Sequence, residues 1–144
     1  MRYHKHDMTF SNKHEVKVIK FDEFSSDIQV IIDKFNERVG TLTLRINNEK
    51  KDIEMAILIY KGYSGRSFGT KAWLTTKAGL IKFFGSYRIW AGTLEENIAM
   101  IRLLQKSGFH LISKESQDYF SDGQIKSVLF FESSRMDMEL NESV

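Results

Sequence analysis

Runs of apolar and β-branched residues dominate the first half of the chain. Residues 28–33 (IQVIID) and 39–46 (VGTLTLRI) form two such runs, and the polar stretch DKFNER between them predicts a β-hairpin. A third run, residues 53–60 (IEMAILIY), is apolar at nearly every position, which predicts a central strand covered on both faces. The partial alternation of residues 16–21 (VKVIKF) predicts a further strand before these three.

Helical spacing appears twice in the second half. The first helix is predicted from Thr70 to a C-cap at Gly85, with one apolar stripe made of Trp73, Leu74, Ala78, Ile81 and Phe84. The second is predicted within LEENIAMIRLLQKSGF, with Ile98, Ile101 and Leu104 on one face and its end at Gly108.

The remaining segments of the second half are typical of strands. Residues 87–92 (YRIWAG) predict a short strand between the two helices. FHLISKESQDYF and IKSVLFFES predict a closing hairpin around Asp122 and Gly123. The whole order predicts an α+β fold in one domain of 144 residues, with a mostly antiparallel sheet flanked by helices and little pattern in residues 1–27 and 135–144.

Composition narrows the class of protein. The chain is 42% hydrophobic and 28% charged, as in soluble globular domains, and no apolar run approaches the roughly 18 residues of a membrane span. We therefore expect no membrane partner and a cytoplasmic location. The absence of cysteine excludes disulfides, zinc-thiolate sites and thiol nucleophiles. A net charge of +2 gives no global field that would attract a nucleic acid, so we expect no nucleic-acid partner. The histidines lack the spacing of a metal site, so we expect no bound metal.

The stretch YSGRSFGTKAW, residues 63–73, joins a predicted strand to a predicted helix. Backbone N–H groups at a helix start favour phosphate, glycine permits close approach, and Arg66 adds positive charge. The spacing matches neither G-x-x-x-x-G-K-[ST] nor G-x-G-x-x-G. GYSGR has Arg66 where a G-x-S-x-G nucleophile elbow needs its second glycine, which argues against a serine hydrolase. Taken alone, a glycine-serine loop between a strand and a helix is an ordinary turn more often than a phosphate site.

From about residue 28 to residue 132, the sequence resembles the GNAT superfamily of N-acetyltransferases, in the branch similar to ribosomal-protein N-terminal acetyltransferases. Residues 64–69 are similar to the family's pyrophosphate loop, [QR]-x-x-G-x-[GA]. Asn97 followed eleven residues later by Gly108 and Phe109, across an amphipathic helix, is the most specific part of the resemblance. The resemblance implies the GNAT-like (acyl-CoA N-acyltransferase) fold, with a mixed, mostly antiparallel sheet.

The resemblance also implies a reaction and a set of residues. Acetyl would pass from acetyl-CoA, the co-substrate, to a primary amine by direct attack, the amine belonging to a small molecule, an amino sugar or a protein N-terminus. Glu54 would be the base, and the backbone N–H groups of Ile57 and Ile59 would meet the pantetheine arm. Asn97 would form a hydrogen bond with the pantetheine or with an oxygen near it. The remaining cofactor-binding residues would be Ser64, Arg66, Ser67, Phe68, Gly69 and Thr70.

Three positions depart from the family pattern. Ser64 replaces the usual Gln or Arg, Ser67 replaces a glycine, and Leu104 replaces a tyrosine that several members use as a general acid. These departures leave an alternative open, namely a GNAT-like domain that has lost catalysis and serves as an acyl-CoA-binding or scaffold module. The acceptor and the oligomeric state also stay open, and the short amino-terminal half is compatible with a homodimer.

Overall fold

The computed structural model describes residues 9–12, 15–20, 27–119 and 124–133. The chain forms two compact units, residues 1–87 and residues 88–144. The predicted turn at Asp122 and Gly123 lies outside the described residues.

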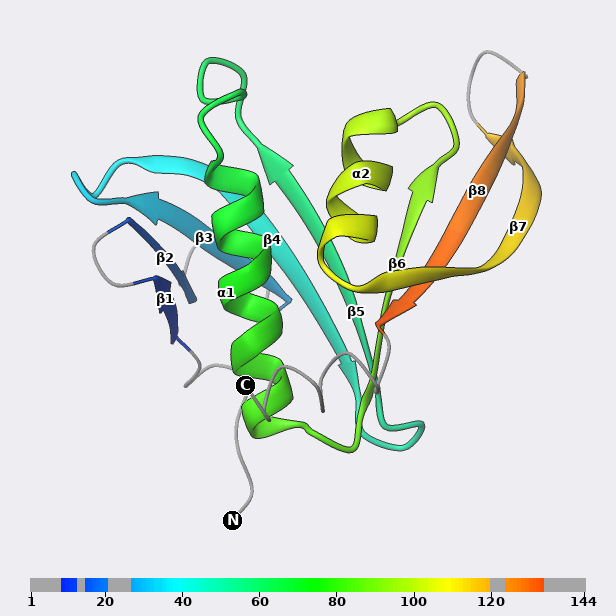
Figure 1. Cartoon of the computed structure of the whole chain (residues 1–144), viewed down its shortest axis with the longest axis horizontal. Coiled ribbons are helices and arrows are strands. Elements are labelled where there is room, and N and C mark those ends of the chain that lie inside the picture. The colour runs from blue at the N-terminus through cyan, green and yellow to red at the C-terminus, as the bar shows by residue number, and fades with distance from the viewer. Residues whose placement is uncertain (1–8, 13–14, 21–26, 120–123, 134–144) are drawn as a thin grey trace. The chain divides into compact units, whose positions relative to one another are not determined.

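The first unit is an antiparallel sheet with one helix (Figure 1). Each strand pairs with the next along the chain, and the register of the β3–β4 pair shifts between Ile31 and Ile32. The predicted hairpin and the strands on either side of it are confirmed, whereas the four-residue first strand was not predicted. The strands are β1 (Thr9–Asn12), β2 (Val16–Lys20), β3 (Ile28–Asp33), β4 (Arg38–Asn47) and β5 (Asp52–Ile59).

Helix α1 (Phe68–Phe83) lies across one face of this sheet (Figure 1). The strand register places Leu42, Leu44, Ile53 and Met55 on one face, and all four are fully buried. The ring of Phe10 on β1 is so close to Gly79 of α1 that no Cβ would fit at Gly79. The helix therefore packs directly on the sheet, and burial of these side chains is the main stabilising term.

The apolar stripe predicted for α1 is wrong in part. Leu74 is 45% exposed and Ala78 is also exposed. The face that packs on the sheet follows the same helical period but includes polar residues, because Thr76 and Lys77 occupy positions one turn from Trp73. Its buried residues are Ala72, Trp73, Thr76, Lys77 and Leu80. The C-cap is Phe84, not the predicted Gly85.

The prediction that the third apolar run is covered on both faces is also wrong. Ile53 and Met55 of β5 are buried on the side of α1, but Ala56 is exposed and Leu58 is 61% exposed. Successive side chains of a strand point to opposite faces, so Glu54, Ala56 and Leu58 share the face away from α1. This face becomes open toward the end of β5 that leads into the loop.

The second unit contains a three-stranded antiparallel sheet and one short helix (Figure 1). Strand β8 pairs with both β6 and β7, and the register of the β7–β8 pair shifts between Leu111 and Ser113. These elements agree with the predicted strand, helix and hairpin. They are β6 (Arg88–Leu94), α2 (Ile98–Lys106), β7 (Phe109–Tyr119) and β8 (Gln124–Ser133).

Gly108 ends α2 as the sequence predicts. Its φ is 81°, in the left-handed region that favours glycine, and the preceding C-cap is Ser107. On the face predicted to be apolar, Leu104 is buried, whereas Ile98 at the helix start is 54% exposed. Across the part of the chain that the structure describes, neither helix is long and apolar enough to cross a membrane.

Candidate functional site

The loop from β5 to α1, residues 60–67, has an unusual backbone. Gly62, Gly65 and Ser67 have φ angles of 100°, 80° and 67°. Glycine adopts this left-handed region at little cost, but a residue with a Cβ is disfavoured there. Ser67, the position where the family pattern has glycine, therefore keeps the backbone conformation of a glycine and bears its steric cost.

The start of α1 presents unpaired backbone donors. Ser67 is the N-cap, its side chain forms no capping hydrogen bond, and the first bond of the helix runs from the N–H of Lys71 to the carbonyl of Ser67, at 3.0 Å. The N–H groups of Phe68, Gly69 and Thr70 precede that bond and have no partner within the helix. Donors of this kind bind anions such as phosphate.

The charge around this helix start also favours an anion. The first turn of α1 contains no acidic residue, and Arg66 is exposed beside it. Lys71 is also near, although it forms an ion pair with Glu15 at 3.3 Å. Among the described residues no carboxylate pairs with Arg66, whose guanidinium lies 5.6 Å from the ring centroid of Tyr63. Its charge is therefore available to a ligand.

The end of β5 lies against the same helix start. A Cβ on Gly69 would come 3.3 Å from Cγ1 of Ile59. The N–H of Tyr60 donates to the carbonyl of Val39 at 2.9 Å, which fixes which β5 positions bond to β4. Because bonded and non-bonded pairs alternate in an antiparallel ladder, Ile57 and Ile59 are non-bonded positions and their N–H groups point away from β4.

Glu54, the predicted base, lies on the β5 face away from α1. Its carboxylate pairs with Arg45, directly opposite on β4, at 3.5 Å, and its side chain is 28% exposed. The structure thus shows a half-buried cross-strand ion pair, in place of an isolated surface charge. Any role as a base requires the carboxylate to leave or share this contact with Arg45.

Tyr63 in the loop makes a polar contact at the surface. Its hydroxyl donates to Oε2 of Glu37 at 2.9 Å, and this contact is exposed. The ring of Phe68 lies 6.2 Å away, centroid to centroid. The hydrogen bond to Glu37, and next the charge of that carboxylate, raise the pKa of Tyr63 above its ordinary value of 10.0, so the phenol stays protonated at neutral pH.

Asn97 lies in the second unit, at the N-cap of α2. Its Oδ1 accepts from the N–H of Met100 at 3.2 Å, which is the capping role that asparagine favours. Its Nδ2 donates to no residue in the described part of the chain. Leu104, at the position of the family tyrosine, is fully buried in the same helix.

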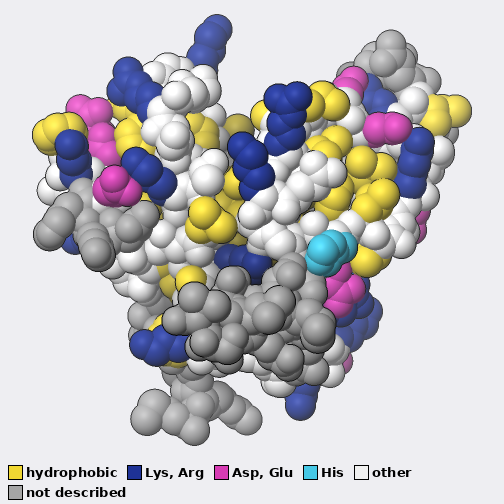
Figure 2. All heavy atoms as spheres, in the orientation of Figure 1, with side chains coloured by type: hydrophobic (Ala, Val, Ile, Leu, Met, Phe, Trp, Pro, Cys, Tyr) yellow, Lys and Arg dark blue, Asp and Glu magenta, His cyan; other side chains and the backbone are white. Residues whose placement is uncertain are grey.

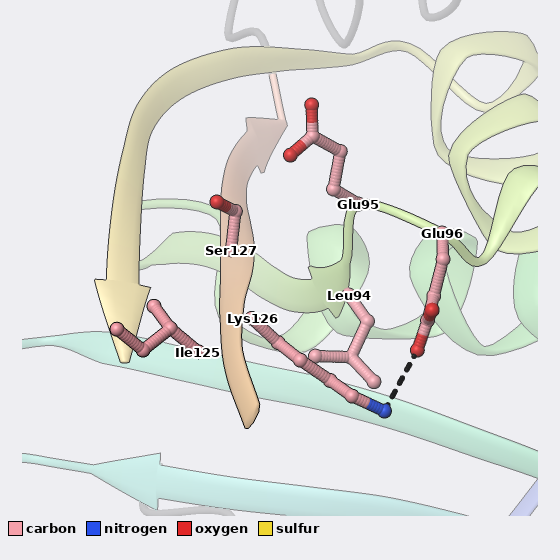
Figure 3. A pocket seen from close by; sticks show the side chains of 6 residues that line it. All are labelled: Leu94, Glu95, Glu96, Ile125, Lys126 and Ser127. Atoms are coloured by element: carbon pink, nitrogen blue, oxygen red, sulfur yellow. Dashed lines mark hydrogen bonds and ion pairs between the residues drawn. The ribbon is translucent and has the colours of Figure 1, made fainter. Parts of the chain in front are cut away.

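An open hollow of about 380 Å³ lies in the second unit, between residues of β6, β8 and the connection that follows β6 (Figure 3). Its charged groups are mutually compensated: Lys126 pairs with Glu96 at 3.1 Å, and Glu95 pairs with Lys114 at 3.0 Å. No feature of the sequence singled out this hollow. It is lined by Leu94, Glu95, Glu96, Ile125, Lys126 and Ser127.

The described residues form no evident metal site. No group of three or more His, Asp and Glu side chains within the described ranges is arranged to hold a metal ion. On the face drawn in Figure 2, the described Lys and Arg side chains alternate with acidic and hydrophobic ones.

A family model described as an acetyltransferase (GNAT) domain matches residues 1–110. The chain belongs to the GNAT acetyltransferase family. The predicted fold class is confirmed, as is the prediction of an acetyltransferase of this family. No curated protein sequence matches this GNAT chain.

Solved structures similar to this GNAT domain share its fold at low sequence identity. A GNAT-family acetyltransferase from Bacillus anthracis has a TM-score of 0.77 at 13% identity, over 90% of this chain and 99% of that one. A spermidine N-acetyltransferase from Vibrio cholerae, in complex with CoA and spermine, has a TM-score of 0.67 at 19% identity. That comparison covers 73% of this chain and 63% of the Vibrio cholerae protein, so the chain spans less than two thirds of that neighbour.

Proposed function

We propose that the protein transfers acetyl from acetyl-CoA to a primary amine. One observation carries the proposal: the start of α1 offers the uncapped N–H groups of Phe68, Gly69 and Thr70 beside Arg66, which pairs with no carboxylate of the described residues. A diphosphate needs this combination of backbone donors and positive charge. The residues present therefore fit the coenzyme, and Ser64 and Ser67 add two exposed hydroxyl groups at the same loop.

The end of β5 supplies the second part of the proposed site. The outward N–H groups of Ile57 and Ile59 would donate to the pantetheine arm and to the thioester oxygen as it gains charge. They are close to the diphosphate position because Gly69 contacts Ile59. In the second unit, the amide nitrogen of Asn97 donates to no described residue, and we propose that it donates to a carbonyl of the pantetheine.

Glu54 is the proposed base. It would take a proton from the acceptor ammonium, after which the amine attacks the thioester carbonyl. The thiolate of coenzyme A then leaves, and the attacking nitrogen gives its surplus proton to solvent to yield the neutral amide. Glu54 shares its face of β5 with the exposed Ala56 and Leu58, which leaves room for an acceptor beside it. The buried Leu104 supplies no proton to the thiolate, so we assign no general acid.

Three further features belong to the proposal: similarity to the branch of ribosomal-protein N-terminal acetyltransferases, a cytoplasmic location and a homodimer. The acceptor amine is to be identified by experiment. Because the Vibrio cholerae neighbour is in complex with spermine, a polyamine belongs among the acceptors to be tested, together with an amino sugar and a peptide N-terminus.

Calorimetric titration with acetyl-CoA, with desulfo-CoA and ATP as controls, tests the proposal. We expect a micromolar dissociation constant for acetyl-CoA, which corresponds to a binding free energy of about −8 kcal/mol, and no heat of binding with ATP. Release of the coenzyme A thiol is then measured with each amine. Binding without turnover on any amine would favour the scaffold alternative, which the departures at Ser67 and Leu104 motivate. Absence of binding at millimolar acetyl-CoA would overturn the proposed function and leave a scaffold with an unknown partner.

A further inference from the structure

Tyr63 connects three parts of the first unit. Its hydroxyl donates to Glu37 in the β3–β4 turn, 26 residues earlier in the chain. Its ring lies under the guanidinium of Arg66, at 5.6 Å, and beside Phe68, the first residue of α1, at 6.2 Å. The same side chain therefore contacts both the charged residue of the loop and the helix start.

The β3–β4 turn, which carries Glu37, is held by hydrogen bonds of its own. Oδ1 of Asp33 accepts from the N–H groups of Phe35 and Glu37, at 2.9 and 3.0 Å. The N–H of Asp33 in turn donates to the carbonyl of Glu37 at 3.0 Å. Because Asp33 is nearly buried, Glu37 starts from a fixed backbone position.

The loop has few other connections of this kind. Among the described residues, the hydrogen bond from Tyr63 to Glu37 is the only side-chain hydrogen bond between residues 61–67 and the rest of the unit. The same loop contains three residues with positive φ, one of them the serine at position 67. Without an external contact, such a segment populates other conformations in which the donors no longer converge.

We propose that Tyr63 is a positioning residue that holds the loop and the start of α1 in the conformation that binds the diphosphate of acetyl-CoA. The inference rests on the proposed function. When only a fraction of molecules has the binding conformation, the apparent dissociation constant rises in inverse proportion to that fraction. Loss of the bond to Glu37 should therefore weaken acetyl-CoA binding without removing any group that touches the ligand.

The test compares Tyr63→Phe with Tyr87→Phe. Both substitutions remove one hydroxyl from an exposed hydrogen bond in the same unit, since the Tyr87 hydroxyl donates to Oδ1 of Asn48 at 2.8 Å. Asn48 lies in the turn between β4 and β5, and the loop follows the other end of β5 (Figure 1). A second pair, Glu37→Gln and Glu37→Ala, keeps or removes an acceptor oxygen for Tyr63.

Two measurements separate positioning from general stability. Amide hydrogen exchange of Lys71, whose N–H donates to the carbonyl of Ser67 at 3.0 Å, is measured without ligand, and acetyl-CoA affinity is measured by titration. We expect Tyr63→Phe to speed exchange and to weaken affinity by roughly threefold to tenfold, the range for one exposed hydrogen bond. Glu37→Ala should match it, Glu37→Gln should have less effect, and Tyr87→Phe should leave both quantities unchanged.

Unchanged exchange and unchanged affinity in Tyr63→Phe would overturn the inference. Equal effects of Tyr63→Phe and Tyr87→Phe would also overturn it, because they would indicate general destabilisation. If the unsubstituted protein binds no acetyl-CoA, the proposed function fails, and the exchange measurement alone still decides whether Tyr63 orders the loop.

Discussion

Gly40 of β4 lies so close to the carbonyl oxygen of Leu58 on β5 that no Cβ would fit between them. The contact involves backbone on both sides, and it occurs just before the loop that leads into α1. The close approach of these two strands therefore fixes the end of β5 from which the outward N–H groups of Ile57 and Ile59 project.

We expect Gly40→Ala to destabilise the fold by about 2 kcal/mol, because the new methyl group must displace backbone. Urea unfolding measures the change. The matched control is Thr41→Ala, whose side chain points to the opposite face of β4, and it should cost less than half as much. Equal stability of Gly40→Ala and the unsubstituted protein would contradict the observed spacing.

Arg66→Gln should weaken acetyl-CoA binding about tenfold or more, because a charge-assisted contact to phosphate is worth roughly 1.5–3 kcal/mol. The loss should shrink as salt is added, since salt screens exposed charges. Lys82→Gln removes an equal charge from the last turn of the same helix and should leave affinity within about twofold. Calorimetric titration at two salt concentrations tests both variants, and equal losses would argue for a general charge effect.

Ser67→Gly should stabilise the protein by roughly 0.5–1 kcal/mol. Relief of a left-handed backbone, worth about 1–2 kcal/mol, exceeds the added entropy of glycine in the unfolded chain. Ser64 does not have a positive φ, so Ser64→Gly brings only the entropic cost and should destabilise slightly. Opposite signs in urea unfolding would support the reading, whereas equal signs would not.

Glu54→Gln should lower kcat at least tenfold and leave the dissociation constant of acetyl-CoA unchanged, because the amide cannot accept the proton of the acceptor. Glu132→Gln is the control, since Glu132 also forms a half-buried ion pair, with Arg88 at 3.1 Å. Steady-state kinetics with an accepted amine separate the two variants. Full turnover by Glu54→Gln would remove Glu54 from the role of base.

The strands were predictable from the sequence because β-branched runs and polar turns carry a local signal. The face of α1 was predicted less well, because Thr76 and Lys77 are buried although their side chains are polar. An apolar count instead selects Leu74, which is exposed. The covering of β5 was mispredicted for a related reason: an apolar run does not reveal that Leu58 is 61% exposed.

The loop was recognisable from its glycines and its position before a helix, and the resemblance to the family added the residues around it. The positive φ of Ser67 could be suspected only from the family's glycine at that position. The link between Tyr63 and Glu37 had no local signal, because the two residues are 26 positions apart in different connections. Contacts of this kind depend on the sheet bringing two turns together.

The side-chain amide of Asn97, at the N-cap of α2, has an oxygen and a nitrogen with separate hydrogen-bonding roles. The helix uses the oxygen of Asn97, through the N–H of Met100, and leaves both hydrogens of the nitrogen for another acceptor. Aspartate at this position would keep the oxygen and replace the donor with a second acceptor. The substitution Asn97→Asp would therefore keep the hydrogen bond that caps the helix and remove the donor that a carbonyl group needs.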